Sequence, residues 1–277
     1  ADATEPDADL LKLKPNSTNY VYVYLTEDTT IYAVWEAIPY TVTIAKNNNG
    51  YGTLTEESDN VRVINNVPYG TVITTGTGEN ANKVTINGTP VTATPAAATA
   101  QFTYGFSGWT NGTATVTGNM TVTANFTRTV NTYDITFKNA DGTTLKKSDG
   151  TTDAVYSVAY GETPAYNGAT PTKDADSEYT YTFNGWDNEI VAVTEDATYT
   201  ATYSTTKVKY TLTWDVNGGN ALTGTYTNGT IDWGTAINKP ADPTKSGYTF
   251  NGWDADNDGT ADDVAATMPT SDVTYKA

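Results

Sequence analysis

The sequence predicts a mostly β protein, with at most a short helix per unit, in which small units follow one another in an elongated array. Thr, Val, Tyr, Asn and Gly are abundant while Leu is scarce, which is typical of pleated strands and tight turns. Four sequence anchors recur in one order three times, which indicates tandem repeats. The connectors between the repeats are too short to act as flexible tethers, so neighbouring units are expected to form a stiff row.

The first two anchors are an alternating strand and an aromatic residue followed by glycine. Alternation with a period of two is typical of a strand with one buried face. Its copies read YTVTI at 40–44, YDITF at 133–137 and YTLTW at 210–214. A glycine at the end of the next strand suits a backbone position with positive φ. The copies of this corner are Tyr69-Gly70, Tyr160-Gly161 and Trp233-Gly234. After the last corner, Pro240 limits any helix to about one turn.

The third anchor places a tryptophan directly after a glycine. YTFNGWD stands at 181–187 and again at 248–254, and YGFSGWT at 104–110 is related to it. Asn-Gly between apolar runs is usually a hairpin turn, but strict alternation would put Phe250 and Trp253 on opposite faces of the strand. A bulge at the glycine would bring both rings to one face. The sequence therefore predicts a strand irregularity that turns each tryptophan into a small core. These tryptophans are Trp109, Trp186 and Trp253.

A strand of the pattern Asp-x-Thr-Tyr-x-Ala-x-aromatic closes each unit. Its copies are NMTVTANF at 119–126, DATYTATY at 196–203 and DVTYKA at 272–277, and DTTIYAVW at 28–35 is the same element near the N terminus. The last copy stops two residues short of its aromatic. The predicted organisation is a partial preceding repeat or cap at 1–37, then units at 38–127 (with an insertion at 71–100), 131–204 and 208–277, the last truncated at its C-terminal end. The chain is thus expected to be part of a longer multi-repeat protein.

Charge and composition exclude several classes of function. The chain has 15 Lys and Arg against 32 Asp and Glu, a formal charge of −17, which repels nucleic acid and anionic membranes. It contains no cysteine and no histidine, so disulfides, thiolate metal sites and the usual general base are excluded. No spacing forces two carboxylates together, so we expect no enzyme. No apolar run is long enough for insertion into a membrane.

The order of the four anchors resembles the Listeria–Bacteroides repeat, also known as the internalin B-type repeat. KPADPTKSGYTFNGWD at 239–254 carries the likeness most strongly, and the likeness covers about residues 38–277. The first unit departs from the pattern through its insertion. The resemblance implies a ubiquitin-like β-grasp fold and a place in large bacterial surface proteins, outside the cell and attached to the wall or envelope. It also implies a structural or adhesive stalk segment that contacts a protein or glycan on another surface.

DADNDGTADD at 254–263 is the sharpest local signal for a ligand. Oxygen ligands at alternate positions followed by a turn glycine, here Gly259, fit the start of a calcium loop. The candidate Ca²⁺ ligands are Asp254, Asp256, Asp258, the carbonyl of Thr260, and Asp262. Ala265 stands where an EF-hand has a bidentate glutamate, so the segment resembles the shorter aspartate loops of extracellular proteins. The alternative is an exposed acidic loop without a metal.

Rows of aromatic residues suggest an alternative function. YVYVY at 20–24 puts three tyrosines on one strand face, and Tyr179, Tyr181 and Phe183 form a similar row. Such rows can stack on sugar rings, which favours a carbohydrate-binding module that uses exposed Tyr or Trp. They are more often packed cross-strand faces.

Overall fold

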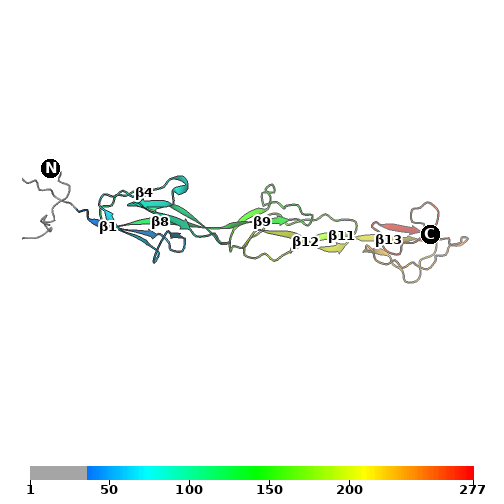
Figure 1. Ribbon diagram of the computed structural model, residues 1–277. Coiled ribbons are helices and arrows are strands. Elements are labelled where there is room, and N and C mark those ends of the chain that lie inside the picture. Colours follow the sequence, from blue (N-terminus) through cyan, green and yellow to red (C-terminus); the bar gives the residue numbers. More distant parts are fainter. Residues whose placement is uncertain (1–35) are drawn as a thin grey trace, which may run out of the picture.

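A computed structural model describes residues 36–277, which form an almost entirely β protein (Figure 1). The strands gather in three successive units that lie in a row, from the blue to the red end of the ribbon. The predicted mostly β class is therefore confirmed. The strand expected at 28–35 and the tyrosines at 20–24 lie outside the described residues.

The three units are named here by their strands. Unit 1 contains β1 (Pro39–Lys46), β2 (Gly52–Leu54), β3 (Arg62–Pro68), β4 (Thr74–Thr75), the 3₁₀ helix η1 (Gly78–Asn80), β5 (Lys83–Ile86), β6 (Thr89–Pro95), β7 (Phe102–Thr110) and β8 (Met120–Val130). Unit 2 contains β9 (Thr132–Lys138), β10 (Val155–Ala159), β11 (Tyr179–Trp186) and β12 (Ala197–Lys207). Unit 3 contains β13 (Lys209–Asp215), β14 (Gly229–Asp232) and β15 (Val273–Lys276).

The main sheets of the three units share one arrangement. Their strand orders are β3-β1-β8-β7, β10-β9-β12-β11 and β14-β13-β15. The first and last strands of each unit are neighbours and run parallel, whereas the flanking strands pair antiparallel. Units 1 and 2 therefore begin and end in the middle of their own sheets, whereas in unit 3 the last strand, β15, lies at the sheet edge.

Alternation along the first strand of each unit supplies the core. In β9, Ile135 and Phe137 are fully buried, while Asp134, which directly precedes Ile135, is exposed. Burial of such side chains contributes about 1.5–3 kcal/mol each. Each unit has a separate hydrophobic cluster. The unit 2 cluster consists of Ile135, Phe137, Ala154, Val193 and Tyr199, with further aromatic rings packed around it.

The bulge predicted before each tryptophan is confirmed in units 1 and 2. The strand register shifts between Phe106 and Gly108 and between Phe183 and Trp186. The glycine before each tryptophan has positive φ, with values of 133°, 98° and 143° along the chain. Phenylalanine and tryptophan then lie on one face, with ring centroids 5.3–5.5 Å apart in all three units. Trp253 is buried, whereas Trp109 and Trp186 are partly buried against their clusters.

The insertion of unit 1 forms a second sheet, which the sequence did not lead us to expect. Strands β4, β5 and β6 pair with one another and with β2 in the order β2-β6-β5-β4. Val84, Ile86 and Val91 from this sheet are buried in the same cluster as β1 and β8. The long middle therefore enlarges the core of unit 1.

No helix forms before Pro240, within the limit of at most a short helix per unit, and η1 is the sole helix between residues 36 and 277. One expectation for unit 3 is wrong: the segment 248–253 is not a strand. In units 1 and 2 the equivalent segment pairs with the second half of β8 or β12. In unit 3, residues 248–253 instead form only isolated bridges, from Tyr248 to Lys245 and from Trp253 to Asp262.

Candidate functional site at the unit junctions and in the aspartate loop

A single residue separates each unit from the next. Asn131 lies between β8 and β9, and Val208 lies between β12 and β13. The N–H of Asn131 donates to the Gln101 carbonyl at 2.9 Å, and that of Val208 donates to the Glu178 carbonyl at 2.9 Å. The last strand of one unit therefore continues almost directly into the first strand of the next.

A tyrosine two residues after each linking residue also crosses the junction. The hydroxyl of Tyr133 donates to the Ala100 carbonyl at 2.6 Å. The hydroxyl of Tyr210 donates to the Ser177 carbonyl at 2.8 Å. Both tyrosine rings pack on the core of their own unit, so each residue joins a core to the neighbouring unit.

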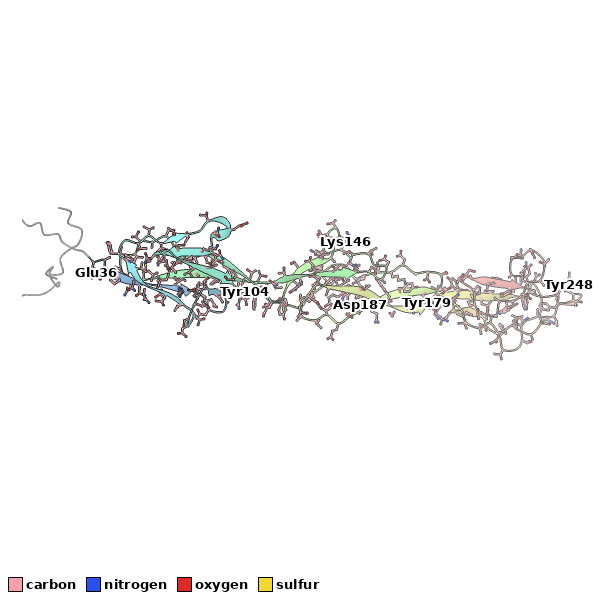
Figure 2. All side chains as sticks on the ribbon, in the orientation of Figure 1. Glu36, Tyr104, Lys146, Tyr179, Asp187 and Tyr248 are labelled. Carbon is pink, nitrogen blue, oxygen red and sulfur yellow. The ribbon has the colours of Figure 1, made fainter. Side chains whose placement is uncertain are left out.

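The aromatic residue of the aromatic-glycine corner also contacts the linking residue, through its backbone N–H. The N–H of Tyr160 donates to the Asn131 carbonyl at 2.9 Å, and that of Trp233 donates to the Val208 carbonyl at 2.8 Å. At the second junction, the Trp233 ring lies 5.5 Å from the ring of Tyr179, which Figure 2 places near this boundary. The two junctions thus share three hydrogen bonds of the same kind.

Sequence reasoning did not single out these junction residues. Asn131 and Val208 have no common chemistry, because their backbone groups make the shared contacts. In the sequence, strand alternation alone accounts for the tyrosine of the first anchor. Its recurrence two residues after each short connector was the signal that could have identified it.

The predicted calcium ligands are brought together only in part. Carboxylate oxygens of Asp254, Asp256 and Asp262 all lie within 4.8 Å of one another. Asp258 is directed elsewhere: its Oδ1 accepts the amide of Thr260 at 2.7 Å and also the Thr260 hydroxyl. The hydrogen bond from the Thr260 hydroxyl is the largest cause that lowers the pKa of the Asp258 carboxyl, and the bond from the Thr260 amide is the second. Three of the four aspartates therefore form one group of hard oxygen atoms.

Backbone amides already hold this loop in shape. The two oxygens of Asp254 accept the amides of Asn257 at 2.6 Å and Gly259 at 2.9 Å. Asp262 accepts the amide of Ala255 at 2.8 Å. Lys276 donates to the side chain of Asn257 at 3.0 Å, which places one positive charge beside the loop. The carboxylates thus have a structural role that requires no metal.

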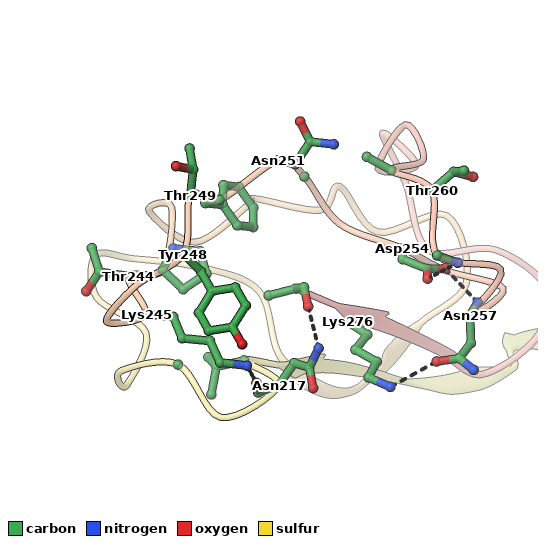
Figure 3. Close-up of a pocket in the computed structure, with 18 of the residues that line it drawn as sticks. Asn217, Thr244, Lys245, Tyr248, Thr249, Asn251, Asp254, Asn257, Thr260 and Lys276 are labelled. Atoms are coloured by element: carbon green, nitrogen blue, oxygen red, sulfur yellow. Dashed lines mark hydrogen bonds between the residues drawn. The ribbon is translucent and has the colours of Figure 1, made fainter.

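The loop borders a hollow of about 520 Å³ at the far end of unit 3 (Figure 3). Asn217, Lys245, Tyr248 and Phe250 line its other side. Tyr248 is 73% exposed, and Lys245 lies over its ring at 4.8 Å.

The aromatic row of unit 2 is engaged in packing. Tyr179 contacts Trp233, and Phe183 contacts Trp186 and Tyr203. The hydroxyl of Tyr181 donates to Asp176 at 2.7 Å, which is the main cause of its raised pKa. Little of this row is free to stack on a sugar ring. No helix of residues 36–277 is long and apolar enough to cross a membrane.

The comparison with family models agrees with the repeat pattern of unit 3. Residues 210–277 match the family described as the Listeria-Bacteroides repeat domain. Internalin H of Listeria monocytogenes is 30% identical over 168 residues, which cover 52% of this chain and 28% of that protein. The chain therefore spans little more than a quarter of this relative. A pair of streptococcal SHIRT domains from a cell surface protein covers 61% of this chain and 99% of its own at 16% identity, with a TM-score of 0.32.

Proposed function

We propose that the chain is a stalk segment of a bacterial cell-surface protein, because residues 210–277 match the Listeria-Bacteroides repeat domain and Internalin H is a relative of the chain. Residues 38–127, 131–204 and 208–277 would be successive β-grasp-like repeats within a longer multi-repeat chain. The stalk would lie outside the cell and be attached to its wall or envelope. No catalytic activity is part of this proposal.

The observation that carries the proposal is the repeated junction. One linking residue, with its N–H and C=O both bonded, leaves little freedom for bending between units. The 11-residue β8 passes through Asn131 into the 7-residue β9, a nearly unbroken run of about 60 Å at ~3.3 Å per residue. A row joined in this way is suited to hold a binding domain away from a surface.

The adhesive part of the proposal concerns the partner. A charge of −17 disfavours nucleic acid and sulfated glycans, so the expected partner is a protein or an uncharged glycan on another surface. Several weak contacts along the row would add through multivalency. Beads coated with the chain should then adhere to such a surface better than beads coated with an equally acidic globular protein. Equal adhesion would remove this part of the proposal.

Small-angle X-ray scattering on the whole chain tests the stalk. We expect the profile of a stiff rod, and a Gly-Ser-Gly-Ser insertion after Asn131 should broaden it by adding a hinge. Antibodies against unit 2 should label intact cells of the bacterium that makes the protein. A compact particle, or labelling that requires permeabilised cells, would contradict the proposal.

Calcium binding in the aspartate loop is a second candidate function. The close approach of Asp254, Asp256 and Asp262 favours it, since Ca²⁺ prefers several carboxylate oxygens. Calorimetric titration of the whole chain should show binding at roughly 10⁻⁴–10⁻³ M, the range of extracellular sites. Asp256→Ala should abolish the heat, whereas Asp263→Ala, which removes an adjacent exposed carboxylate outside the group, should not. A wild-type chain without heat at millimolar Ca²⁺ would exclude the site.

A further inference from the structure

The parallel pairing of the first and last strand recurs in all three units. In unit 1 it runs from Val42 beside Met120 to Lys46 beside Ala124. In unit 2 it joins 135–138 to 197–200, and in unit 3 it joins 212–215 to 273–276. The chain enters each unit through one of these strands and leaves it through the other.

This arrangement determines how tension along the row is carried. The strands lie along the long axis of the molecule (Figure 1). A pull on the two ends of a unit draws the first strand one way and the last strand the opposite way, parallel to their own axes. The hydrogen bonds between two parallel strands are evenly spaced, so all of them bear the load together. A pull across the strands would instead break them one after another.

Buried side chains interlock across the same pair. Phe137 lies beside Tyr199 with stacked rings 5.4 Å apart, and Trp214 lies beside Tyr275 with stacked rings 4.9 Å apart. All four side chains are at most 8% exposed. Sliding one strand past the other would have to separate these rings.

At the N-terminal end of the parallel strand pair, a side chain accepts one more hydrogen bond from a backbone amide of the first strand. Asn119 accepts the amide of Thr41 at 2.8 Å in unit 1. Asp196 accepts the amide of Asp134 at 2.8 Å in unit 2, and Asp272 accepts that of Thr211 at 2.7 Å in unit 3. These acceptors are the first residues of the closing-strand pattern, so the repeat carries the same bond three times.

An asparagine after the first strand acts at the opposite end. Asn47 bonds both backbone groups of Phe126 at 2.9 Å. Asn139 accepts the hydroxyl of Tyr203 at 2.5 Å. Asn217 donates to the Ala277 carbonyl at 3.0 Å. The parallel pair is therefore fastened at both ends in every unit.

We propose that the parallel strand pair is a force-bearing clamp, through which each unit resists tension along the row. The proposal rests on the stalk function for its purpose. Its measurement requires only the purified chain, so a failed location experiment and a failed clamp experiment are distinguishable.

Single-molecule force spectroscopy on the whole chain tests the clamp. The sequence has no cysteine, so engineered cysteines are unique attachment points. Pulling from the two chain ends should give the larger contour-length gain for unit 1, because it contains the insertion. In a second geometry, Ile38→Cys and Thr117→Cys attach the load to the same end of β1 and β8. We expect the unfolding force of unit 1 to fall at least about twofold, since the pair is then peeled rather than sheared. Equal forces in the two geometries would overturn the proposal.

A matched pair of variants in unit 1 tests the end bond. Asn119→Ala removes the acceptor of the Thr41 amide, and Asn119→Asp keeps it, as the aspartates of units 2 and 3 do. Asn82→Ala is the control: it removes one hydrogen bond of 2.9 Å, to Ala93, in the inserted sheet outside the clamp. Pulled end to end, Asn119→Ala should lower the unfolding force of unit 1, while Asn119→Asp and Asn82→Ala leave it near wild type. A drop as large in Asn82→Ala, or no drop in Asn119→Ala, would contradict the clamp.

Discussion

Trp253→Ala is expected to unfold unit 3 and leave the clusters of the other two units folded. Trp253 is 4% exposed, and its ring lies 4.7 Å from Trp214 and 5.5 Å from Phe250. Removing a buried tryptophan costs about 3–5 kcal/mol. A unit of roughly 70 residues has only about 4–10 kcal/mol of stability at 0.05–0.15 kcal/mol per residue. The substitution therefore removes most or all of the stability of unit 3.

Hydrogen exchange followed by mass spectrometry measures the protection of the backbone amides of each unit within the whole chain. The amides of β13 and β15 should lose their protection in Trp253→Ala, while those of β9 and of 197–200 keep it. Tyr248→Ala is the control, because this ring is 73% exposed and should contribute little. Protected β13 amides in Trp253→Ala would refute the assignment of this indole to the core. Loss of protection throughout β9 would refute the independence of the units.

Three further predictions concern charge and the junction. Lys46 has a side chain 1% exposed and pairs with Glu57 at 2.9 Å, so Glu57→Gln should lower the free energy of unfolding of unit 1 by about 3 kcal/mol in chemical denaturation. Hydrogen bonds lower the pKa of Asp141, Asp149, Asp176 and Asp187 in unit 2. A carboxyl whose pKa is lower in the folded state stabilises the unit at pH values above the unfolded-state pKa of about 4, and this contribution is lost as pH falls through the folded-state pKa. Hydrogen exchange should therefore show the stability of unit 2 decreasing as pH falls below about 4. Trp233→Ala should widen the angular distribution between units 2 and 3 in X-ray scattering, and an unchanged profile would contradict the closing role of this ring.

Local pattern was sufficient to predict the first strand of each unit and the tryptophan bulge of units 1 and 2. Alternation in YDITF requires only that one face of a strand be buried, and Ile135 and Phe137 are buried as that rule predicts. The bulge follows from a glycine between two large apolar residues that both need a core. The positive φ of Gly108, 133°, is a conformation that residues with a side chain rarely adopt.

Features that depend on distant residues could not be predicted in this way. Asp196 accepts an amide 62 residues earlier in the chain, so its role is visible only once β9 and β12 are paired. The same letters form a strand at 181–186 but not at 248–253, so local propensity does not decide whether this segment pairs. The carboxylates of Asp254, Asp256 and Asp262 lie close together, as their spacing in the loop pattern suggests. Asp258 instead accepts a hydrogen bond from the Thr260 hydroxyl, a local interaction that the loop pattern does not include.

Tyr210 links the stability of a unit to the geometry of the row. Its ring packs on the core of unit 3, while its hydroxyl bonds the Ser177 carbonyl of unit 2. Unfolding of unit 3 would therefore break the hydrogen bond from the Tyr210 hydroxyl to Ser177. The neighbouring hydrogen bond from the Val208 amide to the Glu178 carbonyl would then break as well. In Trp253→Ala, exchange should accelerate at Val208 although the core of unit 2 remains protected. Tyr210→Phe keeps the ring and removes the hydroxyl, so it should loosen the junction and leave the protection of β13 intact. If Val208 stayed protected in both variants, the junction would be held by unit 2 alone, and core and junction would be independent.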